Sequence, residues 1–180
     1  MDTRSVAGKP ALPDLARRAI HQVATIVRDL DNGVAELVGK MGWGPWDVYE
    51  YVPGRLRDLT VRGEPAECTW IGAETAIGSG LYVEVLQPIS TGGIFDDWLS
   101  AHGEGMHHVG YGAASIEEAE RIKGEMTADG TEVLLSAWID EVYFYYLDTQ
   151  PIIYEVWAGD MTSVSPARQI QGSQVPRPLA

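Results

Sequence analysis

Two stretches of this chain resemble each other, and both carry side chains that can bind a metal ion or transfer a proton. The first stretch, Ile20–Thr25, contains His21 and Gln22, and the second, Gly105–Tyr111, contains a pair of histidines that ends at His108. Each stretch opens a similar series of a strand, a helix and further strands. We therefore predict two related halves whose polar strand residues face each other, since an internal repeat indicates the overall architecture.

Two carboxylates lie inside apolar, strand-like sequence. Glu84 lies in Leu81–Leu86, and Glu155 lies in Ile152–Trp157. Burying a carboxylate without a partner is costly, so a carboxylate in such a strand indicates a specific role. We expect Glu84, Glu155 and His108 to belong to one functional site.

The first half is predicted to fold as a βαβββ unit. A strand over Ile20–Val27 precedes a helix that is capped by Asp29 or Asp31 and ends before Gly42. Turns rich in glycine and proline separate the remaining strands. These strands are expected over Trp46–Val52, Glu67–Ala73 and Leu81–Leu86.

The second half repeats this order after a short connecting helix near Ile94–Leu99. Ser115 and Glu118 form a capping box that starts the long helix of this half. Its strands are expected over Met106–Gly112, Val133–Ala137, Glu141–Leu147 and Ile152–Trp157. We predict one domain, residues 19–158, made of modules 19–90 and 104–158, with an N-terminal tail over residues 1–18 and a C-terminal tail over residues 159–180.

Charge and composition limit the partners that we expect. The chain has 26 acidic and 13 basic residues, so its net charge of -13 repels nucleic acids and anionic lipids. It has no apolar run of the roughly 18 residues that a membrane span needs, and no signal peptide pattern at its start. The single cysteine, Cys68, suits a reducing compartment. We expect a cytoplasmic protein without nucleic acid or membrane partners.

Two βαβββ units side by side are the plan of the vicinal oxygen chelate superfamily, which includes glyoxalase I, bleomycin-resistance proteins, extradiol dioxygenases and methylmalonyl-CoA epimerase. Over about residues 19 to 158 the chain is similar to the epimerase branch. The segments that carry the resemblance are Val83–Pro88, Phe95–Leu99, Gly105–His108 and Ile153–Val156. The resemblance implies an α+β fold in which the two modules form a cupped mixed β-sheet.

The resemblance also implies a divalent metal ion, held in the cup by the first and last strands of each module. When Gln22 is aligned with His108, the implied ligands are Gln22, Glu84, His108 and Glu155. Gln22 departs from the epimerase pattern, which has histidine there, and a shift of one residue would place His21 in the cup instead. The set with Gln22 is rich in oxygen and favours Mn, Mg, Fe(II) or Co, whereas the set with His21 favours Zn, Ni or Co.

A cation in such a cup implies enolate chemistry, in which one or two carboxylates remove and return a proton. Glu155 matches the last-strand carboxylate of the epimerases. Counting back from Glu84 places Glu67 at the second position, with Glu74 and Glu141 as the alternatives. The implied function is that of a metal-dependent epimerase, racemase or isomerase.

The expected partners are a small-molecule substrate and a second copy of the chain in a homodimer. Few basic residues are available to bind the phosphates of coenzyme A, so methylmalonyl-CoA itself is not expected. Aromatic residues crowd the strands, and Trp46, Trp70 and Tyr145 are candidates to stack on a flat substrate ring. An aromatic or polycyclic ketone or dicarbonyl compound is therefore expected.

Two other functions remain open from the sequence. An Fe(II)-dependent ring-cleaving dioxygenase needs two histidines and one carboxylate, and hence His21 in the cup. A metal-free binding protein of the bleomycin-resistance kind is consistent with Gln22 in place of histidine. Glyoxalase or lyase chemistry is a further alternative.

Overall fold

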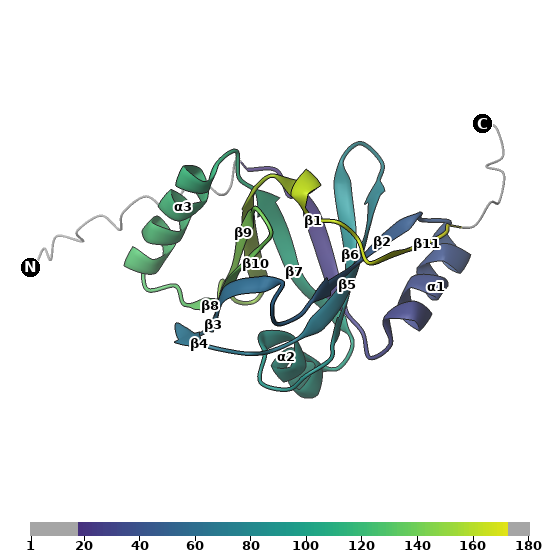
Figure 1. Ribbon diagram of the computed structural model, residues 1–180, viewed down its shortest axis with the longest axis horizontal. Coiled ribbons are helices and arrows are strands. Elements are labelled where there is room, and N and C mark those ends of the chain that lie inside the picture. Colours follow the sequence, from purple (N-terminus) through teal and green to yellow (C-terminus); the bar gives the residue numbers. More distant parts are fainter. Residues whose placement is uncertain (1–17, 173–180) are drawn as a thin grey trace, which may run out of the picture.

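One strongly curved mixed sheet dominates the computed structural model, which describes residues 18–172 (Figure 1). The strands are β1 (Gln22–Ile26), β2 (Trp46–Tyr51), β3 (Leu56–Val61), β4 (Glu64–Pro65), β5 (Trp70–Ile77), β6 (Leu81–Pro88), β7 (Gly105–Gly112), β8 (Val133–Ile139), β9 (Val142–Leu147), β10 (Ile153–Gly159) and β11 (Arg168–Ile170). The helices are α1 (Leu30–Met41), α2 (Ile94–His102), α3 (Ile116–Ala128) and the 3-10 helix η2 (Met161–Ser163).

The antiparallel pair β1–β7 lies at the centre of the sheet and joins two similar halves. Outward from β1 follow β6, β5 and β2, and outward from β7 follow β10, β9 and β8. Each central strand pairs in parallel with the last strand of its own module. The two modules are therefore equivalent, and the predicted α+β fold of two βαβββ units in one cupped mixed sheet is confirmed.

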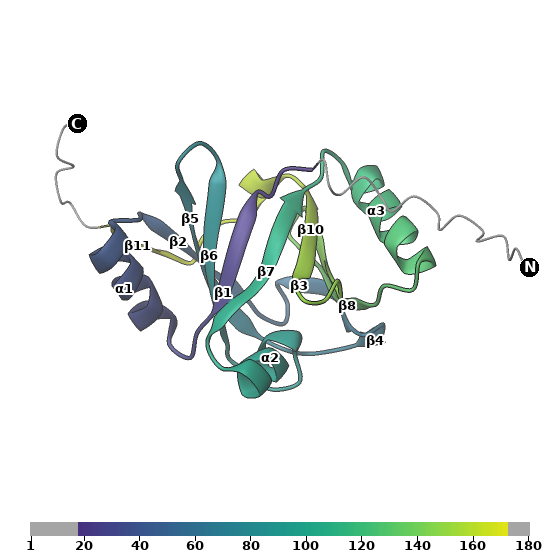
Figure 2. The ribbon, with the colours of Figure 1, turned by 180° about the vertical axis from the view of Figure 1, so that it is seen from behind.

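Helices α1 and α3 cover the outer face of the sheet, one on each module, as the view from behind shows (Figure 2). The Asp29 side chain accepts a hydrogen bond from the backbone N–H of Asn32 and caps α1, and Ser115 caps α3 in the same way through Glu118. Leu30 in α1 is buried against the first module. The apolar stripe of each helix thus fixes which face of the sheet it covers.

Helix α2 closes the bottom of the cup between the two modules. Phe95 is buried there, with its ring centroid 5.1 Å from that of Trp70 and 5.5 Å from that of Tyr146. Cys68 is buried in the same cluster, where it packs as a small core residue. This aromatic layer supports the strands that carry the polar site above it.

Three short strands were not predicted from the sequence. They belong to two segments that are exchanged between the modules. The hairpin β3–β4 leaves the first module and pairs with β8 of the second, whereas β11 leaves the second module and pairs with β2 of the first. In β3, polar residues interrupt the alternation, and Asp58 has a positive φ of 52° at an irregularity in the register. The exchange leaves only very short strands at the sheet edges, which limits edge-to-edge association.

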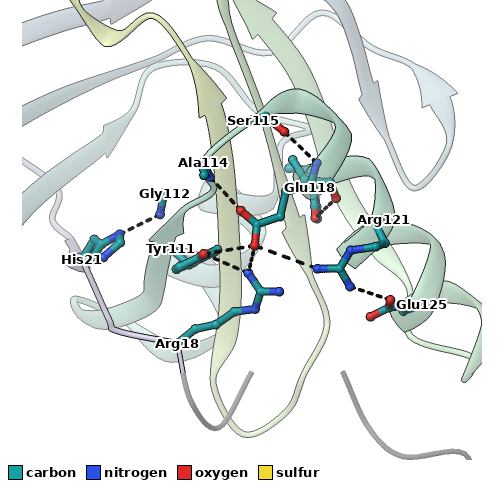
Figure 3. Close-up of polar contacts among 11 residues, drawn as sticks. Arg18, His21, Tyr111, Gly112, Ala114, Ser115, Glu118, Arg121 and Glu125 are labelled. Carbon is teal, nitrogen blue, oxygen red and sulfur yellow. Dashed lines mark hydrogen bonds and ion pairs between the residues drawn. The ribbon is translucent and has the colours of Figure 1, made fainter. Parts of the chain in front are cut away.

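The ends of the domain differ in part from the expected tails. Strand β11 and η2 lie within the predicted C-terminal tail, and residues 1–17 and 173–180 lie outside the described residues. The Arg18 guanidinium donates to the Tyr111 hydroxyl at 2.9 Å and pairs with Glu118, which ties the start of the described chain to α3 (Figure 3). The limits of the domain, residues 19–158, stay a prediction.

None of the helices formed by residues 18–172 is long and apolar enough to cross a membrane.

Replacing Phe95 with alanine should lower the free energy of unfolding by about 3 to 5 kcal/mol, because the change leaves a cavity under the sheet. Chemical denaturation followed by circular dichroism measures this loss. Ile89, which is 56% exposed, provides the control, and Ile89→Ala should change stability by no more than about 0.5 kcal/mol. Equal effects of the two substitutions would contradict the role given to α2.

Candidate metal centre

Three buried side chains from three strands converge at the centre of the cup. His108 Nε2 on β7 lies 3.4 Å from Glu84 Oε2 on β6 and 3.1 Å from Glu155 Oε2 on β10. One potential ligand atom from each residue lies within 4.8 Å of the others. The sequence predicted these three residues as ligands, and the structure brings them together.

Small residues between the polar side chains make this convergence possible. Ala24 lies directly between Glu84 and His108 in the strand register, and Gly110 lies directly between Gln22 and Glu155. A Cβ atom on Gly110 would lie 2.8 Å from Gln22 Oε1 and 2.5 Å from a ring carbon of Trp157. The side chains on either side can therefore lean over the middle strands and meet.

Gln22, and not His21, joins the cluster. Gln22 Oε1 lies 3.3 Å from His108 Nε2, while its Nε2 donates to Glu74 Oε1 at 3.1 Å. His21 precedes β1, and its Nδ1 accepts from the backbone N–H of Gly112 at 3.1 Å (Figure 3). The structure thus places the carboxamide where the alignment of the two halves puts it, and it places His21 outside the group.

A β-bulge brings a second histidine against His108. The register of β1 against β7 skips His107, so that His107 and His108 both reach the interior although they are neighbours in sequence. Their Nδ1 atoms lie 2.8 Å apart, so one ring donates and the other accepts. Burial, together with the charge of His108, lowers the pKa of His107 to about 2. His107 is therefore a neutral core histidine that orients its neighbour.

The electrostatics of the cluster suit a cation. Burial raises the pKa of Glu84, and burial with the charges of Glu84 and Glu155 raises the pKa of Glu74 well above its usual range. Burial alone would lower the pKa of His108, but Glu155 and Glu84 outweigh this and raise it to about 9. The Oε2 atoms of Glu84 and Glu155 are buried without a hydrogen bond. Two carboxylates, an imidazole and a carboxamide oxygen are a donor set that fits a hard divalent cation.

Glu74, and not Glu67, is the additional carboxylate at the site. Glu74 lies directly opposite Glu84 in the β5–β6 hairpin, on the same face of the sheet. Glu67 precedes β5 and is exposed in a separate depression beside Cys68, and Glu141 is exposed as well. The ungapped count back from Glu84 failed because the tight turn at residues 78–80 determines the register. Symmetry about that turn would have identified Glu74.

A cavity of about 300 Å³ opens above this cluster. Four carboxylates line it, and no lysine or arginine of the described chain does so. The rest of the lining is mainly apolar and aromatic. The lining residues are Gln22, Asp47, Tyr49, Tyr51, Glu74, Tyr82, Glu84, Ile139, Val142, Phe144, Tyr146, Glu155, Trp157, Met161, Thr162 and Val164.

The three aromatic residues predicted to bind substrate do not line this cavity. Trp46 is buried under α1, and Tyr145 is buried under α3 with its hydroxyl donating to the Ala119 carbonyl at 2.7 Å. Trp70 lies in the core and stacks on Tyr51 at 4.8 Å. Alternation along the strands explains the error for Trp46 and Tyr145, because Phe144 and Tyr146 face the cup while Tyr145 between them faces the helix. Trp70 shares a face of β5 with Glu74, but it is buried beneath Tyr51 in the core.

Residues 21–146 match the family model described as the Glyoxalase/Bleomycin resistance protein/Dioxygenase superfamily. A search of curated proteins by sequence found no match.

Solved structures with a similar fold include several methylmalonyl-CoA epimerases. One, in complex with methylmalonyl-CoA and NH4+, has a TM-score of 0.55 and 19% identity, over 83% of this chain and 99% of that chain. A Streptomyces coelicolor variant in complex with 2-nitronate-propionyl-CoA has a TM-score of 0.54 and 20% identity, over 79% and 98%. The Mycobacterium tuberculosis protein has a TM-score of 0.56 and 14% identity, over 78% and 87%. At these identities the likeness shows a common fold.

Metal affinity should rise with pH. A ligand histidine must be neutral, but the pKa of metal-free His108 is raised to about 9, so binding displaces a proton below that pH. For one displaced proton, the affinity for Mn2+ should fall about tenfold per unit as the pH is lowered from 9. Calorimetric titration in buffers of different ionisation enthalpy measures both the Mn2+ affinity and the number of protons displaced. His102→Ala, at an exposed histidine, should leave the profile unchanged, and a pH-independent affinity would contradict the assignment.

Gly110→Ala should weaken Mn2+ binding by about 10- to 100-fold, because the added methyl group displaces the donor oxygen of Gln22 and the neighbouring ring of Trp157. Equilibrium dialysis measures the affinity. Gly124→Ala on α3 is the matched control, since its added Cβ contacts nothing within 4 Å. Unchanged affinity in a folded Gly110→Ala protein would show that close packing over β7 does not shape the site.

Proposed function

Because this chain belongs to the Glyoxalase/Bleomycin resistance protein/Dioxygenase superfamily, we propose that it is a metal-dependent epimerase, racemase or isomerase that acts at an enolisable carbon. The observation that carries this proposal is the buried group of Glu84, His108 and Glu155, whose two carboxylates line a cavity together with Gln22 and Glu74. The fold is shared with solved methylmalonyl-CoA epimerases, which supports the same class of reaction.

Glu84, His108, Glu155 and Gln22 would hold a divalent metal ion, of which Mn, Mg, Fe, Co, Ni and Zn are the candidates. When bound, such an ion supplies positive charge that stabilises an enolate beside it. The protein contributes the orientation of the ligands. Gln22 is fixed by its bond to Glu74, and His108 by its contact with His107.

Two carboxylates are placed to move the proton. Glu74 lies on β5 and Glu155 on β10, and the strands β6, β1 and β7 separate them in the sheet. Inversion of a carbon centre needs a proton carrier on each side of it, and carboxylates from the two modules meet this need. Burial and the neighbouring carboxylates raise the pKa of Glu74 well above its usual range, which suits a group that donates a proton near neutral pH.

The substrate that we propose is a small aromatic or polycyclic ketone or dicarbonyl compound. Tyr49, Tyr51, Phe144 and Trp157 line the cavity and offer flat faces to a ring. This aromatic lining replaces the one predicted from the sequence. The cytoplasmic location and the homodimer stay predictions.

The dioxygenase alternative receives no support from the site. It requires two histidines and one carboxylate around the metal. His21 bonds to the backbone of Gly112, and His107 contacts the far nitrogen of His108, so neither reaches the carboxylates. A metal-free binding protein is the other alternative, and proton exchange distinguishes it from an isomerase.

In deuterated water with Mn2+, one enantiomer of 2-phenylcyclohexanone should gain deuterium at its chiral carbon and lose optical purity, without oxygen uptake. Glu74→Gln should slow this exchange at least about 100-fold and leave Mn2+ bound, because it removes a proton carrier outside the ligand group. Glu155→Gln should lower both the exchange rate and the Mn2+ affinity. Mass spectrometry and chiral chromatography measure the exchange.

Glu67→Gln is the control for these variants, because Glu67 is exposed and lies outside the cavity, and it should retain the full exchange rate. Full activity of the Glu74→Gln protein would contradict its role as proton carrier. Tight binding of the ketone without any exchange would assign the chain to the metal-free binding proteins, and oxygen uptake would favour the dioxygenase.

A further inference from the structure

The C-terminal residues 160–170, here called the strap, cross from the end of β10 to the outer side of β2 (Figure 1). The strap contains η2 and β11. Met161, Thr162 and Val164 of the strap line the cavity above the metal centre. Val164 is also buried, in the core cluster that contains the cavity residues Phe144 and Tyr146. The strap is therefore a wall of the site as well as a connection between the modules.

The strap is held at both of its ends and in its middle. The Ser163 hydroxyl accepts from the backbone N–H of Glu141 at 3.1 Å, in the turn between β8 and β9. Farther along, Arg55 donates to the Ser165 carbonyl at 2.9 Å. These bonds hold the strap against the second module and the connection that follows β2.

On the first module, β11 pairs with β2 through three residues, Arg168–Ile170. The Gln169 side chain donates to Asp47 Oδ1 at 2.9 Å, and Asp47 itself lines the cavity. Arg168 pairs with Asp31 at the start of α1. The wall is consequently fixed in place on both sides of the cavity.

The charges around this wall oppose a polyanionic ligand. The cavity lining holds Asp47 in addition to the three glutamates of the centre, and among the described residues no lysine or arginine lines it. Arg55, which contacts the strap, is paired with Asp140, and Arg168 of the strap itself is paired with Asp31. Phosphate groups are usually bound by free arginine or lysine side chains. The strap offers none to the phosphates of coenzyme A.

The volume of the cavity sets a second limit on the ligand. A dry, apolar cavity of about 150 Å³ in an engineered protein holds one benzene molecule. The present cavity of about 300 Å³ thus suits a ligand of about two rings. We propose that the strap and the carboxylates that line the same cavity together make the site selective: the strap limits it to compact ketones, and the carboxylates exclude coenzyme A thioesters. This inference rests on the proposed function, since it names the substrate class of the same site.

Calorimetric titration of the Mn2+-loaded protein tests the inference with three probes, 2-phenylcyclohexanone, the larger 2-(2-naphthyl)cyclohexanone and methylmalonyl-CoA. The wild-type protein should bind the phenyl ketone at least about tenfold more tightly than either other probe. Met161→Ala enlarges the wall side of the cavity and should shift the preference toward the naphthyl ketone by about tenfold. Methylmalonyl-CoA should stay excluded, because the substitution leaves the carboxylates unchanged.

Met41→Ala is the matched control, because Met41 is exposed to a similar degree, 55% against 48% for Met161, and lies at the end of α1 away from the cavity. It should keep the wild-type preference, and equal denaturation midpoints of the two variants exclude a general loss of structure. Binding of methylmalonyl-CoA as tight as that of the phenyl ketone would overturn the inference, and so would an unchanged size preference in Met161→Ala.

Proton exchange, measured separately, distinguishes this inference from the proposed function. Exchange in methylmalonyl-CoA would support the isomerase function and overturn the selectivity of the strap. A size preference that responds to Met161→Ala, in a protein that exchanges no proton, would support the selectivity and overturn the isomerase function.

Discussion

The interaction on which the site depends is the attraction between His108 and the carboxylates buried around it. Taking several like charges out of water is costly, and one imidazolium offsets only part of that cost. Several features of the neighbouring strands bring these groups together. The residues between them in the register, Ala24 and Gly110, are small, and the bulge at His107 turns a second ring against His108. A bound cation would replace the proton on His108 and complete the balance of charge.

This centre lies where the two modules meet, so it requires the whole fold. Its four polar residues come from the neighbouring strands β6, β1, β7 and β10, which belong to both halves. The exchanged segments reinforce this dependence, because β3–β4 and β11 each leave one module to pair with the other. One of these connections also forms a wall of the cavity. The edge pairing of the sheet and the proposed selection of the substrate thus involve the same stretch of chain.

Much of the site was accessible from the sequence, because it follows from the repeat. Aligning the two halves placed Gln22 at the position equivalent to His108, and apolar surroundings marked Glu84 and Glu155. The aromatic predictions failed for a definable reason: Trp46 and Tyr145 lie on strands whose alternate residues face a helix instead of the cup. Glu67 failed because a tight hairpin places Glu74 across from Glu84. Both errors concern register and not composition.

The sequence by itself determined the two modules, their helices and the kinds of group at the centre. Periodicity, caps and turn residues are local properties, and they can be read without knowing what the chain packs against. Only the tertiary structure decided which face each aromatic residue occupies, where β3 and β11 pair, and that residues 160–170 wall the cavity. Those features depend on contacts between segments far apart in the sequence, and a shift of a single residue in strand pairing moves every side chain to the opposite face.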